Sequence, residues 1–188
     1  MTTLILNGSA RPDGDVAALI EALRSRLNGD VLELSPRDGV SPCTDCRACW
    51  ARRGCAIDDA MRPVYPFYEA ADNLVLASPV WFSALSGPLM DLAGRLAQPY
   101  FAARRFRGET PAICEKRGVL LLAAGNEKSA DIPAAATARA IFRSLRAEQV
   151  ALAASLETDR RPAAADEAAL GQVRSAAELL NRLHARNG

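Results

Sequence analysis

Near its N-terminus the chain carries Thr3-Leu4-Ile5-Leu6-Asn7-Gly8-Ser9-Ala10-Arg11-Pro12-Asp13-Gly14-Asp15, which predicts a strand, a loop and the start of a helix. The apolar run 3–6 ends at an Asn-Gly pair, as a buried strand does before a turn. Beyond the loop, apolar residues recur at helical spacing, at Val16, Leu19, Ile20, Leu23 and Leu27. The loop contributes backbone N–H groups, a hydroxyl and a guanidinium, which together suit a phosphate. The alternative is a plain turn in which Asp15 caps the helix.

The rest of the chain repeats the same alternation of strand and helix. Short apolar runs predict further strands at residues 31–34, 74–77, 119–123 and 150–153. Periodic stretches predict helices around residues 86–95, 131–146 and 163–186. Glu33 in the second run and the weaker apolar character of the last run favour edge positions, since a central parallel strand is buried on both faces. We therefore predict an α/β fold, a doubly wound five-stranded parallel sheet with strand order 2-1-3-4-5.

Ligands bind such sheets beyond the carboxyl ends of the strands, so the loops that follow the central strands are the candidate site. After the third strand come Ser78-Pro79-Val80-Trp81-Phe82, whose two aromatic rings suit one wall of a flat ligand. After the fourth come Ala124-Gly125-Asn126, where the glycine permits close backbone approach. The alternatives are that the aromatic pair packs in the core and that the second segment is a helix-entry turn.

Composition limits the classes of function. The 188 residues are 49% hydrophobic and 24% charged, which predicts one globular domain, 1–188, with a Cys-rich insertion at about 36–58. A net charge of +1 argues against nucleic acid and anionic membrane as partners. The first ten residues lack a signal pattern, so we expect a cytoplasmic protein with reduced thiols. The single histidine, His184, disfavours histidine metal sites and Ser-His or Cys-His catalysis, and we predict no catalytic side chain.

The most specific motif is a run of four cysteines, Cys43-x2-Cys46-x2-Cys49-x5-Cys55. Four thiols within 13 positions can surround one soft metal centre, and the first three have ferredoxin-like spacing. Structural zinc more often uses two separated pairs. A [4Fe–4S] cluster, zinc and no metal all remain open, whereas Cys114 stands apart and is expected to be a packing residue.

In their order along the chain, the loop 7–15, the cysteine run, Asp58-Asp59-Ala60-Met61 and the segment 78–82 resemble the NAD(P)H-dependent FMN reductase and iron–sulfur flavoprotein branch of the flavodoxin superfamily. The resemblance covers residues 2–126 and implies a flavodoxin-like fold, non-covalent FMN and a homodimer or homotetramer. It implies that the FMN phosphate is held by Ser9, Arg11, Gly14, Asp15 and Val16. It implies that the isoalloxazine is lined by Ser78, Pro79, Val80, Trp81 and Phe82 on one side and by Ala124, Gly125 and Asn126 on the other. By the same resemblance, the metal ligands of a possible [4Fe–4S] cluster are Cys43, Cys46, Cys49 and Cys55.

This chain departs from the family loop at Asp15 and Val16, where the family commonly has Asn and a hydroxyl residue. A carboxylate beside a phosphate is repulsive unless it turns away. The expected function is an FMN-binding oxidoreductase that takes hydride from NAD(P)H and reduces a quinone, a nitro or azo compound, a metal ion or a protein acceptor. One alternative is an FMN electron carrier, with or without a cluster, that does not oxidise NAD(P)H. Another is a cofactor-free or zinc-binding interaction module.

The arginines at 47, 52, 53, 104, 105 and 107 are expected to be solvated surface residues. A second interpretation is that one of them pairs with the 2′-phosphate of NADPH.

Overall fold

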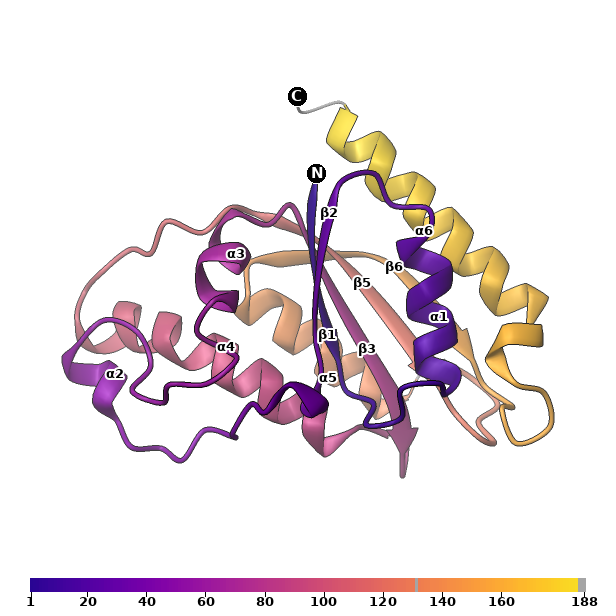
Figure 1. The fold of residues 1–188 in the computed structure, drawn as a ribbon, viewed down its shortest axis with the longest axis horizontal. Coiled ribbons are helices and arrows are strands. Elements are labelled where there is room, and N and C mark those ends of the chain that lie inside the picture. Colours follow the sequence, from indigo (N-terminus) through magenta and orange to yellow (C-terminus); the bar gives the residue numbers. More distant parts are fainter. Residues whose placement is uncertain (131, 186–188) are drawn as a thin grey trace.

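The computed structural model describes residues 1–130 and 132–185. Its parallel strands are β1 Thr2–Asn7, β2 Asp30–Leu34, β3 Asn73–Trp81, β5 Lys116–Ala123 and β6 Ala147–Ser155. They pair in the order β2-β1-β3-β5-β6, and the two-residue strand β4, Ala84–Leu85, adds antiparallel to the end of β3 (Figure 1). The five parallel strands thus have the expected order, and only the short β4 shifts the numbering. Glu33 lies on the edge strand β2, as its charge predicted, and accepts hydrogen bonds from Asn7 and Arg24.

Helices cover both faces of the sheet. Its helices are α1 Asp15–Arg24, α2 Ala48–Ala51, α3 Val64–Ala70, α4 Gly87–Phe106, α5 Pro133–Ser144 and α6 Glu167–Ala185, with 3-10 turns η1 Pro36–Asp38 and η2 Ala163–Ala165. Figure 1 shows α1 and α6 together on one face, and α3, α4 and α5 on the other. The helices predicted around residues 86–95, 131–146 and 163–186 are present with altered ends, and positions 131 and 186 of those predictions lie outside the described residues. The helix predicted to end at residue 95 continues to Phe106, with Pro99 inside it.

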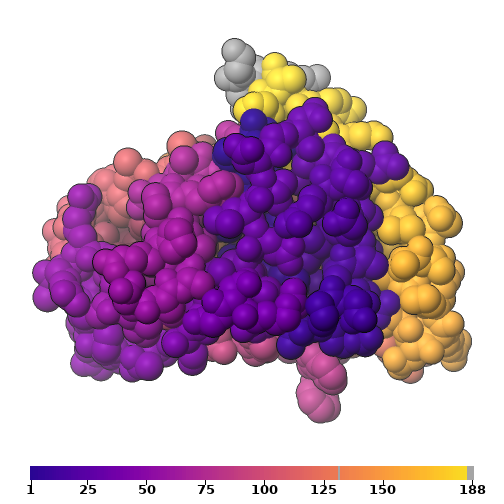
Figure 2. All heavy atoms as spheres, viewed as in Figure 1, coloured from indigo at the N-terminus to yellow at the C-terminus, as the bar shows by residue number. Residues whose placement is uncertain are grey.

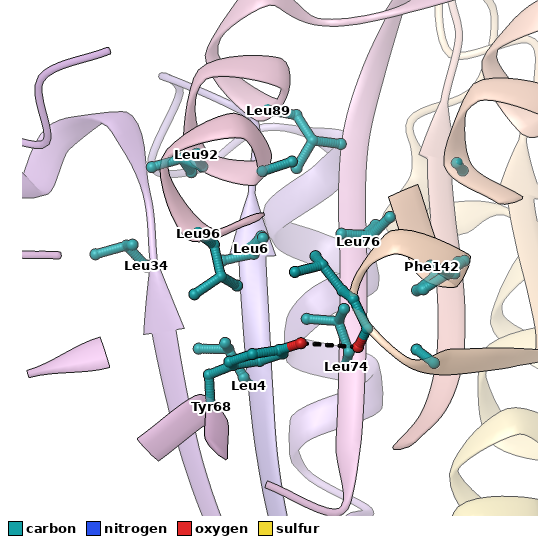
Figure 3. Close-up of a cluster of buried hydrophobic side chains, with 14 of the residues drawn as sticks. Leu4, Leu6, Leu34, Tyr68, Leu74, Leu76, Leu89, Leu92, Leu96 and Phe142 are labelled. Atoms are coloured by element: carbon teal, nitrogen blue, oxygen red, sulfur yellow. Dashed lines mark hydrogen bonds between the residues drawn. The ribbon is translucent and has the colours of Figure 1, made fainter. Parts of the chain in front are cut away.

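The core lies in two layers because successive strand side chains point to opposite faces. Leu4 and Leu6 pack with Leu74 and Leu76 against α4, whereas Ile5 faces α1 and α6 (Figure 3). The dashed line in Figure 3 marks the buried hydroxyl of Tyr68, which donates 2.8 Å to the Leu145 carbonyl. Both faces of the central strands are buried, and this explains their uninterrupted apolar runs.

The stretch 36–58 has little regular structure. It holds only η1 and the four-residue helix α2, and α2 packs on α4. The single-domain division with an insertion at about 36–58 stays a prediction. No helix in the described part of the chain is long and apolar enough to cross a lipid bilayer.

A buried cation lies at the amino end of β5. The side chain of Lys116 is almost fully buried, and its Nζ donates to the carbonyls of Ala71 at 2.9 Å and Cys114 at 3.0 Å. The ammonium also stands 4.6 Å from the centre of the Tyr68 ring. Burial outweighs these contacts and lowers the pKa of Lys116 from 10.5 to about 8.

This lowered pKa predicts that stability rises with pH. Between pH 8 and 10.5 the unfolded chain holds a proton on Lys116 that the folded chain has released, so the free energy of unfolding increases with pH, by on the order of 2–3 kcal/mol. Urea unfolding from pH 7.5 to 10 is expected to show this increase in the wild type and to lose it in Lys116→Met. Lys128→Met, at an exposed lysine, is the matched control and keeps it. Equal pH slopes in all three proteins would contradict the assignment.

Candidate functional site

The three loops expected to form one site do meet at the carboxyl edge of the sheet. Asn7 is in register with Ala77, and Pro79 with Ala123, so the ends of β1, β3 and β5 are adjacent. The amide of Gly8 donates 2.7 Å to the Ala77 carbonyl, which ties the first loop directly to β3.

The first loop is held in shape by its own side chains. The Asn7 Oδ1 accepts from the Ser9 amide at 2.8 Å, and the Ser9 Oγ accepts from the Arg11 amide at 3.2 Å. Arg37 donates to the Ser9 carbonyl at 3.2 Å. In contrast, the exposed guanidinium of Arg11 has no hydrogen bond or ion pair with any residue that the structure describes. It is a free cation at the mouth of the loop.

Helix α1 begins without a side-chain cap, and the interpretation of Asp15 as its N-cap is wrong. The N-cap position is Gly14, and within the described chain no side chain accepts a hydrogen bond from the first turn. Asp15 turns away from the loop, and its Oδ1 accepts from the Ala163 amide at 2.7 Å. This satisfies the condition that its carboxylate should not face a bound phosphate. The uncapped amides at the positive end of the helix dipole remain free for an anion.

Two of the predicted contact residues use their side chains elsewhere. Val16 is 2% exposed and packs in the core, so only its backbone amide can face a ligand. The buried Ser78 hydroxyl donates to the Pro79 carbonyl at 2.7 Å and accepts from the Ser86 amide at 2.9 Å. Ser86 in turn caps α4 and donates 2.9 Å to the Gly8 carbonyl. Ser78 therefore fixes the first loop and α4 in place.

The aromatic pair lies on a projecting hairpin, so the alternative that it packs in the core is wrong. Trp81 is 63% exposed and Phe82 is fully exposed. Figure 2 shows the end of β3 as a narrow spur at the lower edge of the molecule. Trp81 pairs with Ala84, and Phe82 and Ser83 have φ of 51° and 58°. Positive φ at both residues of a two-residue loop is typical of a type I′ turn, which normally selects Asn and Gly.

The strain of this turn is offset by contacts from Glu127, just after the third loop, and from the first turn of α5. Ser83 donates its hydroxyl to Glu127 at 2.8 Å, and its carbonyl accepts from the Ala134 amide at 2.9 Å. Strained backbone held in this way is common at binding sites. The hairpin is thus fixed so that Trp81 and Phe82 stand in solvent beside the loops.

The third loop is locked to the segment after β6. The Ala124 carbonyl accepts from Thr158 at 2.9 Å, and the Gly125 carbonyl accepts from Asp159 at 3.2 Å. A Cβ at Gly125 would lie 2.7 Å from the carboxylate of Asp159, so any other residue would have to displace this exposed side chain. Because α5 begins only at Pro133, this segment is not a helix-entry turn. Asn126 is exposed at the edge.

The residues that sequence reasoning missed at this edge are Asn7, Arg37, Ser86 and Glu127. Asn7 follows directly on the apolar run of β1, and a buried amide at a strand end is a signal that could have been used. The other three act through contacts distant in sequence, such as the 28 residues between Arg37 and Ser9.

The four motif cysteines line one small cavity, of about 20 Å³, beneath α2 and α4. Cys43 and Cys46 are exposed, and Cys49 and Cys55 are half-buried. Burial raises the pKa of the Cys49 thiol above its ordinary value. In the described chain no three of the thiols stand close enough to hold a single metal ion. The fifth, Cys114, is exposed rather than packed in the core, which corrects that expectation.

A buried ion pair attaches this cysteine segment to α4. Arg95 is 1% exposed, and its guanidinium binds both carboxylate oxygens of Asp59, at 2.9 and 3.1 Å. Arg95 also donates to the Ser41 carbonyl, and Asp59 accepts from the Ser41 and Met61 amides, each at 3.0 Å. Burial would raise the pKa of the Asp59 carboxyl, but these hydrogen bonds outweigh it and hold that pKa below its usual value.

Several arginines at positions 47–53 and 104–107 make contacts within or around the cysteine segment. Arg47 stands over the Trp50 ring, Arg107 donates to the Cys49 carbonyl, and Arg53 pairs with Glu109 at 3.5 Å. The Trp50 ring stacks on that of Phe106, with centroids 4.0 Å apart. None of these contacts selects an arginine for the 2′-phosphate of NADPH, and that interpretation stays a prediction.

Solved structures share the whole fold. An NAD(P)H:quinone oxidoreductase from Methanothermobacter marburgensis superposes with a TM-score of 0.70 at 18% identity, covering 98% of this chain and 97% of that one. An FMN-dependent NADH-azoreductase from Bacillus anthracis, solved with FMN, gives 0.69 at 16% identity, covering 96% and 100%. The protein therefore has the flavodoxin-like fold, as expected.

The sequence identifies the family within that fold. The model of the NADPH-dependent FMN reductase family matches residues 1–159, and the chain belongs to this family. This confirms the family resemblance and the expectation of an oxidoreductase.

Two curated relatives carry the name iron–sulfur flavoprotein. The one from Methanocaldococcus jannaschii is 29% identical over 100 residues, covering 50% of this chain and 51% of that protein. The one from Methanosarcina thermophila is 32% identical over 81 residues, covering 43% and 42%. The chain thus aligns with about half the length of the curated relatives it matches.

Proposed function

We propose that the protein binds FMN at the carboxyl edge of its sheet, takes hydride from NAD(P)H and passes the electrons to an acceptor such as a quinone, a nitro or azo compound, a metal ion or a protein. Bound FMN supplies the chemistry of accepting hydride and releasing electrons. The observation that carries the proposal is the free Arg11 guanidinium in the loop before the uncapped amides of α1, at the same edge of the sheet as the exposed Trp81 and Phe82. A cationic loop and an exposed aromatic pair at one edge of the sheet suit a phosphate joined to a flat ring.

Each part of the edge has a role in this proposal. The first-turn amides and Arg11 hold the phosphate, with Ser9 and Gly14 setting the loop. The hairpin residues 79–82 line one side of the ring, and 124–126 line the other. No side chain serves as a general base, since the protein's role is to bind the flavin and align the nicotinamide.

Anaerobic stopped-flow mixing with NADPH or NADH tests the proposal. Rapid bleaching of the flavin absorbance is the expected result. An FMN-bound protein that does not bleach would leave only the electron carrier. A colourless protein that ignores added FMN and contains zinc would favour the interaction module.

The Arg11 assignment makes a quantitative prediction. Arg11→Ala is expected to weaken FMN binding by about 1.5–3 kcal/mol, or roughly 10–150-fold in Kd, because a charged hydrogen bond to phosphate is lost. Fluorescence titration of the apoprotein with FMN measures this. Arg26→Ala makes the same charge change beyond the other end of α1 and should leave the Kd within about twofold. Similar losses in both variants would mean that only net charge matters.

We further propose that the four motif cysteines hold a second redox centre. Four thiols around one cavity are a donor set for a [4Fe–4S] cluster, and two relatives are named iron–sulfur flavoproteins. Such a cluster supplies one-electron transfer. In a [4Fe–4S] cluster each thiolate binds a different iron, so the four cysteine sulfur atoms lie further apart than they would around a single metal ion. The exposed Cys43 and Cys46 are free to adjust around it.

We also propose a homodimer or homotetramer. Trp81, Phe82, Met90, Phe101 and Phe106 are large apolar side chains between 42% and 101% exposed. Burying such a surface favours association. Light scattering of the purified protein is expected to give a multiple of the chain mass.

A further inference from the structure

The buried guanidinium of Arg95 has one donor that the fold does not use. Its two terminal nitrogens donate to Asp59 and to the Ser41 carbonyl. Its Nε is buried and has no acceptor among the residues that the structure describes. A buried charged donor without a partner is rare and costs stability, so a missing acceptor is the simplest explanation.

The surroundings of Arg95 indicate what that acceptor is. Arg95 lines the same cavity as Cys43, Cys46, Cys49 and Cys55. The one carboxylate among the lining residues, Asp45, is exposed and already pairs with Arg47 at 3.3 Å. The other side-chain oxygens in the lining belong to Thr44 and Gln98, which are both exposed. The remaining acceptors are the cysteine sulfur atoms, which become strong acceptors when they are deprotonated by binding a metal.

We propose that the Nε–H of Arg95 donates a hydrogen bond to a cysteine sulfur of the [4Fe–4S] cluster and thereby raises the cluster's reduction potential, an inference that rests on the cluster part of the proposed function. Four thiolates concentrate negative charge at one point, and each added electron increases it. A hydrogen bond to sulfur stabilises the more negative, reduced state. The bidentate contact with Asp59 fixes the guanidinium, so Asp59 positions the donor.

Arg95→Lys isolates this hydrogen bond. Lysine keeps a positive charge for Asp59 but has no N–H at the Nε position. Wild type and variant are reconstituted with iron and sulfide under anaerobic conditions, and iron per chain is measured. The cluster is then titrated with dithionite and mediators, followed by electron paramagnetic resonance, and the FMN potential is recorded in the same sample.

In Arg95→Lys the ratio of reduced to oxidised cluster at a fixed potential is expected to fall at least tenfold, which is 59 mV for a one-electron couple. The FMN potential is expected to stay unchanged. Arg62→Lys is the matched control, since Arg62 lies near the same segment in an exposed pair with Asp58. It is expected to leave both potentials unchanged.

The outcomes separate the two levels of the proposal. A wild type that retains FMN but incorporates no iron overturns the cluster and this inference, while FMN reductase function stands. A cluster with the same potential in wild type and Arg95→Lys overturns the role of Arg95 alone. Where Arg95→Lys fails to fold, resonance Raman spectra of the wild type in H2O and D2O decide. Iron–sulfur stretching bands that shift on exchange support a hydrogen bond to sulfur, and bands that do not shift refute it.

Discussion

Replacing Asp59 by alanine is expected to lower the free energy of unfolding by about 3–5 kcal/mol. The substitution leaves the guanidinium of Arg95, which is 1% exposed, without its anion. It also leaves the Ser41 and Met61 amides without their acceptor. Removing one member of a buried ion pair costs far more than the pair contributes, because the remaining charge stays out of water.

Urea unfolding at pH 7, followed by circular dichroism, measures the effect. Asp58→Ala is the matched control, since the neighbouring carboxylate forms an exposed pair with Arg62 at 2.6 Å and should change stability by less than about 1 kcal/mol. The double variant Asp59→Leu/Arg95→Met removes both charges and is expected to recover part of the loss. If Asp59→Ala proves as stable as Asp58→Ala, the pair is not buried in solution.

The arrangement of the sheet could be predicted from the sequence because it depends on local patterns. Runs of apolar residues mark strands buried on both faces, and the charged Glu33 marks an edge. Once the strand order is set, the loops after residues 6, 77 and 123 must share one edge. The grouping of the candidate flavin loops therefore followed from pattern and topology together.

The details of the site could not be predicted, because they depend on contacts distant in sequence. Asp15 was expected either to cap α1 or to turn away, and its actual partner is Ala163, 148 residues later. Phe82 and Ser83 have positive φ although neither is a glycine, so the sequence did not indicate this turn. Turns of this type become visible in a sequence only when Asn or Gly occupies them.

Arg95 shows the same limit within a helix. The helix was predicted around residues 86–95 and so ended at this residue. In the structure the helix continues, and Arg95 is buried beside Leu92 and Leu96. Its partner Asp59 comes from an irregular segment 36 residues earlier, and no periodic pattern joins the two.

Gly8→Val is expected to destabilise the protein by about 3 kcal/mol and to weaken FMN binding at least tenfold. A Cβ at this position would lie 2.5 Å from the Ser86 Oγ and 2.6 Å from the Leu89 Cβ. Neither neighbour can move freely, because the Ser86 hydroxyl caps α4 at the Leu89 amide and donates to the Gly8 carbonyl. The loop itself must then shift away from α4, carrying Arg11 with it.

Gly94→Val provides the matched control for this substitution. Gly94 lies within α4, and a Cβ there meets no atom within 4 Å. The same change should therefore alter stability by less than about 0.5 kcal/mol and leave FMN affinity intact. Thermal unfolding and flavin titration of both variants compare close packing at Gly8 with open space at Gly94. Wild-type stability and FMN affinity in Gly8→Val would show that the first loop is not held against α4, and the geometry proposed for the phosphate would fail with it.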